Sequence, residues 1–150
     1  MLKRRCQILK KKSFLLAGST LNTLQFKFPY IKGYPKLMAK LGIQNQTARY
    51  FRFLIDSGAD YTVIPNSYAA LLGLEYNKIE SEEIKVEVAN LAFMHTKKTN
   101  LTLTLEGHNF EIPVLIAKEE AECLLGRKGI FEHFDITFQE RNEEVIFQQK

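Results

Sequence analysis

The sequence predicts a small, mainly β domain with one or two short helices, and three observations support this fold class. Apolar residues alternate with charged or hydroxyl residues at 84–88 and 101–105, which is the period of half-buried strands. Residues 49–55 are rich in aromatic and branched side chains, as in a buried strand. The chain has 150 residues, 45% of them hydrophobic and 25% charged, which is typical of one soluble globular domain.

The first half of the chain predicts four strands and one helix. The strands are expected at residues 24–30, 36–43, 49–55 and 61–64. Pro29 limits the first of them to a sheet edge, because proline cannot donate a ladder hydrogen bond. A short helix is expected over residues 67–73, with Asn66 as its cap and Gly73 as its end.

The second half predicts mainly strands, with no internal repeat. They are expected at residues 84–88, 101–105, 110–117, 135–138 and 145–147. Residues 106–109 have the composition of a hairpin connection. Residues 118–122 predict a charged loop or a single helical turn, and residues 127–134 resemble a helix.

Positive charge is concentrated at the N-terminus. The net charge is +4, and six of the 21 Lys and Arg residues are Lys3, Arg4, Arg5, Lys10, Lys11 and Lys12. We expect residues 1–23 to be a basic, flexible segment and residues 24–150 to be the domain. A solvated tail is favoured over a nucleic-acid arm, because no basic stripe continues beyond it. Nucleic-acid binding through residues 1–12 stays as a weaker alternative.

Neither a membrane partner nor a metal or other cofactor is expected. The apolar run after the basic segment is too short for a secretory signal, and no run approaches the roughly 18 apolar residues of a membrane span. The two cysteines, Cys6 and Cys123, have no CxxC spacing and no neighbouring histidine cluster. A reducing, cytoplasmic location follows as an expectation, with Cys123 as a small buried side chain.

The residue that points to chemistry is Asp56, which directly follows the predicted strand at 49–55. An ionised carboxylate at the end of a buried strand is costly unless it is hydrogen-bonded or functional. Ser57 can donate a hydrogen bond, and Gly58 lets the backbone pass closely with its amide directed at the carboxylate. A structural Asp-Ser-Gly turn is the alternative interpretation.

Two motifs in register resemble the retropepsin-like (retroviral-type) aspartic peptidases. The active-site turn of that family, two hydrophobic residues followed by Asp-Ser/Thr-Gly-Ala, matches LIDSGAD at residues 54–60. The family's later pair of hydrophobic residues with glycine matches Leu124, Leu125 and Gly126, about seventy residues further on. The resemblance covers roughly residues 34–148. It implies a closed or nearly closed β-barrel of the acid-protease type, with Ala59, Leu125 and Gly126 supporting the active-site turn.

The resemblance implies an aspartic endopeptidase in which two aspartates activate a water molecule. One carboxylate takes the proton of the water while the other polarises the scissile carbonyl. The chain has only three aspartates, Asp56, Asp60 and Asp135, and no second Asp-Ser-Gly turn. The second catalytic aspartate is therefore expected from a second copy, in a homodimer that binds an extended peptide.

Further roles follow from the same resemblance. Asp60 and Arg127 are expected to form an ion pair near the dimer interface, and Ser57 to hydrogen-bond across the dimer axis. A hairpin flap over the site is expected within residues 85–103. Its tip is assigned to Ala89, Asn90, Leu91, Ala92 and Phe93.

The flap departs from the family pattern, because no glycine occurs between Gly73 and Gly107. We expect Asn90 to adopt the positive φ that glycine normally supplies. A flap without glycine also favours the alternative function, a catalytically silent dimerisation or peptide-binding module on the same fold. His95, His108 and His133 are expected to be surface or interface residues.

Overall fold

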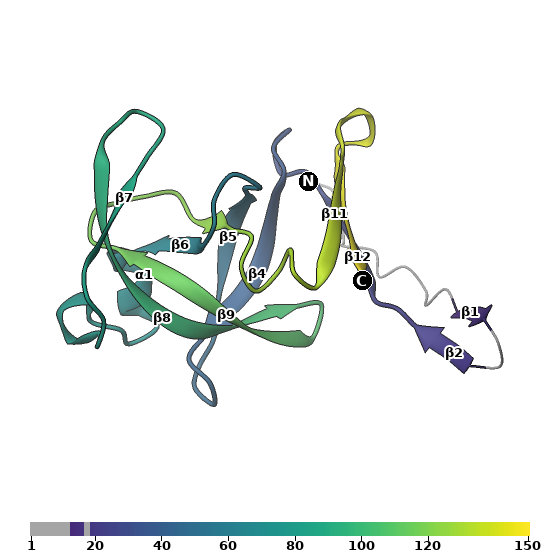
Figure 1. The fold of residues 1–150 in the computed structure, drawn as a ribbon, viewed down its shortest axis with the longest axis horizontal. Coiled ribbons are helices and arrows are strands. Elements are labelled where there is room, and N and C mark those ends of the chain that lie inside the picture. Colours follow the sequence, from purple (N-terminus) through teal and green to yellow (C-terminus); the bar gives the residue numbers. More distant parts are fainter. Residues whose placement is uncertain (1–12, 17–18) are drawn as a thin grey trace.

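The computed structural model describes residues 13–16 and 19–150 (Figure 1). The basic residues at positions 3–12 and Cys6 lie outside the described residues. The described elements, in chain order, are β1 (Ser13–Leu16), β2 (Ser19–Asn22), β3 (Gln25–Pro29), β4 (Lys36–Gly42), β5 (Arg49–Ile55), β6 (Thr62–Pro65), α1 (Asn66–Leu71), the 3-10 helix η1 (Tyr76–Lys78), β7 (Ile84–Glu87), β8 (Phe93–Leu105), β9 (His108–Ala117), β10 (Leu124–Leu125), β11 (Phe134–Gln139), the 3-10 helix η2 (Glu140–Asn142) and β12 (Glu144–Gln149).

Six strands close into a barrel. Hydrogen bonding runs in the order β4-β5-β10-β6-β9-β8, and β8 pairs back with β4 through Lys40–Thr104, Leu41–Leu103 and Gly42–Thr102. β7 pairs only with β8, so it lies outside the ring. The predicted fold class, mainly β with a closed barrel, is confirmed. No helix in the described part of the chain is long and apolar enough to cross a membrane.

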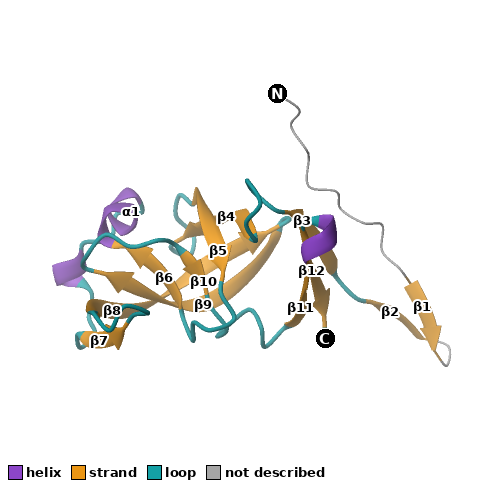
Figure 2. Cartoon of the chain, turned by 90° about the horizontal axis from the view of Figure 1, so that it is seen from above, coloured by secondary structure: helices purple, strands orange, loops and turns teal. Residues whose placement is uncertain are grey.

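Two smaller sheets lie on one side of the barrel (Figure 1). β3, β12 and β11 form an antiparallel sheet, which brings residues 25–29 against the C-terminal strand. Pro29 lies in β3, an edge strand of this sheet, as its missing amide hydrogen requires. β1 and β2 pair with one another as a separate two-stranded sheet, which lies beyond the three-stranded sheet in both views (Figures 1 and 2).

The barrel wall is covered on both faces at β6, whose four residues are all buried. Ile64 belongs to the main core, which extends to Phe134 and Phe147 of the three-stranded sheet. Val63 points the opposite way, into a second cluster with Met94 and Leu115. The alternation of side chains along a strand explains why neighbouring residues belong to different clusters. Because both faces are covered, the strand is apolar in the sequence except at Thr62.

The predicted helix at residues 127–134 is wrong. The segment forms consecutive turns, with the amide of Phe131 donating to the carbonyl of Arg127 (2.9 Å) and that of Phe134 to Ile130 (3.0 Å). Gly129 has a φ of +85°, a left-handed conformation that interrupts a right-handed helix. A Cβ at Gly129 would also lie 2.7 Å from Ile112. Contact with β9 therefore holds the segment out of helical geometry.

The helix after β6 is present, but its predicted cap is wrong. α1 begins at Asn66 itself, with Pro65 in the N-cap position and no side-chain capping hydrogen bond. Gly73 ends the helix as predicted. Its φ is +80°, and its amide donates to the carbonyl of Ala70 at 3.0 Å.

Candidate active site

Asp56 lies at the junction between β5 and a tight turn, and its carboxylate is fixed by that turn. The amide of Gly58 donates to Asp56 Oδ1 at 2.8 Å, and the amide of Ala59 donates to the Asp56 carbonyl at 3.3 Å. The predicted contact between the Gly58 amide and the carboxylate is confirmed. Asp56 is half-buried and Ser57 and Gly58 are exposed, so the carboxylate is rigidly held at an accessible edge of the barrel.

β10 holds the turn from behind. Leu124 and Leu125 pair in parallel with Leu54 and Ile55, and Leu124 also pairs antiparallel with Val63. These two residues thus lie between the strands that enter and leave the turn. The amide of Asp56 donates to the carbonyl of Leu125 at 3.0 Å. The structure therefore brings together the two motifs that the sequence placed in register.

The residues after β10 clamp the second half of the turn. The amide of Arg127 donates to the carbonyl of Ala59 at 2.9 Å, and the amide of Lys128 donates to the carbonyl of Asp60 at 2.8 Å. Together with the Asp56–Leu125 bond, these contacts fix both ends of the turn to one segment. The position of the carboxylate is thus determined by backbone hydrogen bonds.

Gly126 is required by a close approach of two backbones. A Cβ built there would lie 2.3 Å from the carbonyl carbon and oxygen of Tyr61 and 2.8 Å from the amide nitrogen of Thr62. The amide of Gly126 donates to Thr62 Oγ1 at 3.2 Å, and Thr62 is fully buried. Thr62 was missed as a support residue. The signal for it was a hydroxyl side chain within the otherwise apolar strand that follows the turn.

Asp60 and Arg127 lie beside one another, as the resemblance implied, but at the surface. Arg127 Nη1 is 3.7 Å from Asp60 Oδ1, and the two side chains are 60% and 67% exposed. An exposed pair of this kind contributes little stability to an isolated chain. Its predicted place near a dimer interface stays a prediction, as does the role of Ser57 across a dimer axis.

The β7–β8 hairpin projects from the barrel and forms the candidate flap (Figure 1). β8 pairs with β9 from Thr96 onward, so the projecting part is shorter than the predicted residues 85–103. Leu91, not Asn90, has the positive φ (+62°), so the prediction for Asn90 is wrong. Asn90 Oδ1 instead accepts a hydrogen bond from the amide of Ala92 at 3.1 Å. A leucine thus occupies the left-handed position that usually favours glycine.

The flap tip exposes bulky apolar side chains. Leu91 is 77% exposed and Phe93 is 62% exposed, whereas Met94, the next residue of β8, is buried in the second apolar cluster. Val88 and Ala92 close the turn through a backbone hydrogen bond of 3.0 Å. The flap therefore directs one face toward the barrel and leaves apolar surface at its tip without intramolecular cover.

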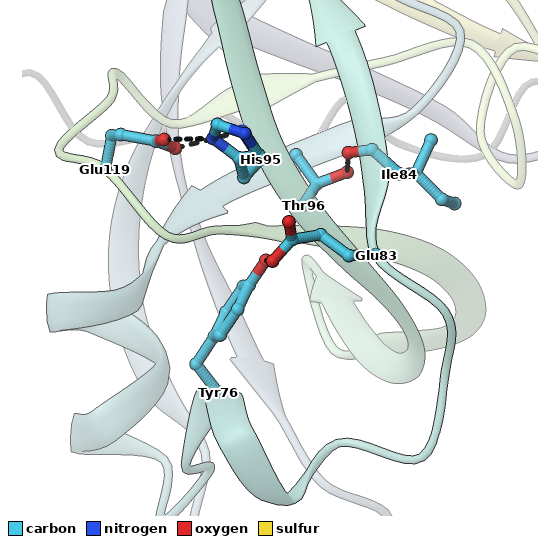
Figure 3. Close-up of polar contacts among 6 residues, drawn as sticks. All are labelled: Tyr76, Glu83, Ile84, His95, Thr96 and Glu119. Carbon is cyan, nitrogen blue, oxygen red and sulfur yellow. Dashed lines mark hydrogen bonds and ion pairs between the residues drawn. The ribbon is translucent and has the colours of Figure 1, made fainter.

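The base of the flap is tied to its surroundings by side-chain hydrogen bonds (Figure 3). His95 Nδ1 lies 2.7 Å from Glu119 Oε1, and the His95 amide donates to Glu119 Oε2 at 3.0 Å. The hydrogen bond with His95 lowers the pKa of Glu119. Thr96 Oγ1 donates to the carbonyl of Ile84 at 2.9 Å, across the two strands of the flap. The flap is thus hinged on β9 and the loop that follows it.

A second tie joins the flap to the preceding loop. Tyr76 OH donates to Glu83 Oε2 at 3.0 Å, immediately before β7 begins (Figure 3). Burial of the Tyr76 ring, together with this carboxylate, raises the pKa of Tyr76 to about 12. The phenol therefore stays protonated and remains a donor over the whole physiological pH range.

Among the described residues, the cysteine and histidine candidates form no second functional site. In the ranges that the structure describes, no group of three or more His, Cys, Asp or Glu side chains could hold a metal ion. Cys123 is 4% exposed, and burial raises the pKa of its thiol to about 12. The expectation that it is a small buried side chain is confirmed. His108 and His133 are exposed, and each packs beside a phenylalanine ring.

A family model and solved structures match this chain. Residues 39–129 match the family model described as gag-polyprotein putative aspartyl protease. A solved structure, a retropepsin-like aspartic protease from Rickettsia conorii, superposes with a TM-score of 0.60 at 15% identity, covering 85% of this chain and 91% of that one. The EIAV protease complexed with the inhibitor HBY-793 gives a TM-score of 0.47 at 20% identity, covering 65% and 85%. No curated protein matches the chain.

The family match spans more than half of the chain and includes both motifs, from within β4 to the turn after β10. The likeness to the Rickettsia protein, at low identity, concerns the fold and extends over most of both chains. The barrel with the short helix α1 is thus a retropepsin-like fold, and the chain belongs to the gag-polyprotein putative aspartyl protease family.

Proposed function

We propose that this protein is an aspartic endopeptidase whose catalytic dyad consists of Asp56 from each of two subunits. The observation that carries the proposal is the geometry of the turn. Asp56 Oδ1 accepts the Gly58 amide, and Leu125 and Arg127 anchor the backbone on both sides of it. A preorganised carboxylate at an accessible edge is what acid–base catalysis on a peptide requires.

The second carboxylate has to come from another molecule. Asp60 lies beside Arg127, and Asp135 lies on β11 with Lys150 Nζ 3.8 Å away. Neither is presented by a turn like that of Asp56. A two-fold axis beside the turn supplies an identical Asp56 and is the simplest arrangement, since two-fold dimers are the commonest oligomers. The exposed Ser57, Asp60 and Arg127 then lie where the two subunits meet.

The reaction needs no group other than the two aspartates and a water molecule. Two carboxylates about 3 Å apart share one proton, because they cannot both be ionised. The ionised carboxylate takes a proton from the water, which attacks the scissile carbonyl, and the protonated carboxylate donates its proton to the carbonyl oxygen, giving a tetrahedral gem-diol. The first carboxyl group then gives its proton to the amide nitrogen, the second takes a proton from one hydroxyl of the gem-diol, and the C–N bond breaks as the carbonyl forms again. The peptide lies in extended form between the flap and the turn, adding a strand to the flap.

Aspartate-to-asparagine variants test the proposal directly. Asp56→Asn keeps the size of the side chain and its acceptor oxygen for the Gly58 amide, but removes the ionisable group. We expect it to cleave no peptide in a proteome-derived library read by mass spectrometry, while its circular dichroism matches the wild type. Asp135→Asn is the matched control and should keep full activity. Cleavage by purified Asp56→Asn protein would contradict the proposal.

Mixing experiments test whether the dyad spans two subunits. When equal amounts of wild-type and Asp56→Asn chains exchange at random, about one quarter of the dimers carry two aspartates. Activity should therefore fall to about half of that expected from the wild-type chains alone, because half of them are paired with an inactive partner. Activity that depends only on the amount of wild-type chain would exclude a shared site.

A catalytically silent peptide-binding module is the second candidate function. The observation in its favour is Leu91, a bulky residue at the turn position where a mobile flap would benefit from glycine. A statine-type transition-state analogue distinguishes the two. A working dyad binds the analogue far more tightly than the corresponding plain peptide, whereas a silent module binds both alike.

A further inference from the structure

Two lysines converge on one tyrosine beside the catalytic turn. Lys128 Nζ donates to Tyr61 OH at 2.9 Å and lies 4.3 Å from the centre of the Tyr61 ring. Lys98 Nζ lies 5.9 Å from the same centre. The three residues come from β8, from the segment that leads into β6, and from the turn after β10. They meet only because the barrel brings these three segments together.

The lysines lie at the border of an apolar row of side chains that starts beside the turn. Strand register places Lys98 opposite Leu115, Leu115 opposite Val63, and Val63 opposite Leu124, so the four side chains form one row across the sheet. Tyr61 is two residues before Val63 and packs against the same cluster, which also receives Val86 and Val88 of the flap hairpin. The row therefore runs between the catalytic turn and the flap.

The two lysines make the surroundings of the Tyr61 hydroxyl positive, although acidic groups lie nearby. Asp60 and Glu132 both lie near Lys128, and Asp60 also acts on Tyr61. Even so, the hydrogen bond from Lys128 lowers the pKa of Tyr61, and Lys98 acts in the same direction. Lys98 and Lys128 are exposed, with their ammonium groups open to a ligand.

We propose that Tyr61, Lys98 and Lys128 form a subsite that binds an acidic side chain, glutamate or aspartate, of the peptide substrate. The apolar row accommodates the stem of that side chain, and the two ammonium groups and the phenol hydroxyl bind its carboxylate. This inference rests on the proposed function and adds a substrate class to it. An exposed carboxylate paired with two lysines gives a preference of about tenfold for glutamate over glutamine in kcat/KM at low salt.

The test is a comparison of peptide pairs that differ only in Glu or Gln. Sequences cut by the wild-type protein in the peptide library supply the pairs. We expect Lys98→Gln and Lys128→Gln each to reduce the preference about threefold, and the double variant to abolish it. Lys40→Gln is the matched control, because Lys40 Nζ lies 5.1 Å from the Tyr50 ring centre in a second lysine–tyrosine pair remote from the turn. The preference should also fall with added salt.

The outcomes separate this inference from the proposed function. Cleavage without any preference for acidic residues, or a preference that survives in the double variant, overturns the subsite while the peptidase stands. If no peptide is cleaved, the proposed function fails. The subsite is then tested by binding: peptides of the same library that are retained by the Asp56→Asn protein are identified. Enrichment of acidic peptides that Lys98→Gln/Lys128→Gln abolishes supports the subsite, and selection without such enrichment overturns it.

Discussion

Replacing Gly126 with alanine tests whether the close approach behind the turn holds the candidate site together. The new Cβ would lie 2.3 Å from the carbonyl carbon of Tyr61, whereas unbonded carbons normally lie about 3.5–4.0 Å apart. The two backbones must therefore separate by about 1 Å. Overpacking of this kind costs about 1–3 kcal/mol, and weakening the Asp56–Leu125 and Gly126–Thr62 hydrogen bonds costs about 1 kcal/mol each. We expect a loss of about 3 kcal/mol or more in unfolding free energy.

Urea unfolding followed by circular dichroism measures this loss. With a slope of about 2 kcal/mol per molar, the midpoint should fall by about 1.5 M. Gly107→Ala is the control, because Gly107 has a φ of +81° and a Cβ added there would have nothing within 4 Å. It should lose only about 1–2 kcal/mol, the cost of a left-handed alanine. A Gly126→Ala variant no less stable than Gly107→Ala would refute the reasoning.

Three further predictions concern the flap and the buried thiol. Leu91→Gly should raise the unfolding free energy by about 0.5 kcal/mol, because relief of the left-handed leucine slightly exceeds the entropic cost of glycine; a decrease in urea midpoint would contradict this. In a Cys6→Ser background, Cys123 should react with a thiol reagent at pH 8 only after denaturation, and rapid labelling of the native protein would be the contrary result. The folded-state pKa of Glu119 lies below its unfolded value, so its contribution is present above the unfolded pKa and is lost as pH falls through the folded pKa. The protection factor of the His95 amide, its exchange rate relative to that of an unfolded peptide at the same pH, should therefore fall over that acidic range, and Glu119→Gln should remove this change in protection.

Most of the strands and the turn that carries Asp56 were predictable because their signals are local. Alternation at residues 101–105 reflects a strand with one face in the core, and the φ of Gly73 follows from its place after a helix. The contact between Gly58 and Asp56 spans only two residues, so residue types alone indicate it.

Features set by distant contacts, or by competition between two conformations of one turn, were not predictable in the same way. The spacing of apolar residues at 130, 131 and 134 fits a helix, but Ile112 on β9 fixes the left-handed Gly129 that breaks it. The sequence favours Asn90 for a positive φ because asparagine tolerates it best. In the structure Asn90 instead accepts the Ala92 amide, which leaves the left-handed position to Leu91. Local preference was outweighed by hydrogen bonding in the turn.

The two-residue strand β10 has a consequence for folding. Its partners in β5 lie about seventy positions earlier in the chain, so the contact closes a long loop and is slow to form. During synthesis from the N-terminus, the segment with Asp56 emerges long before Leu125 and Gly126 are available to fix it. We therefore expect nascent chains that end before residue 123 to lack an ordered turn at Asp56, so that an organised candidate site is a late product of folding.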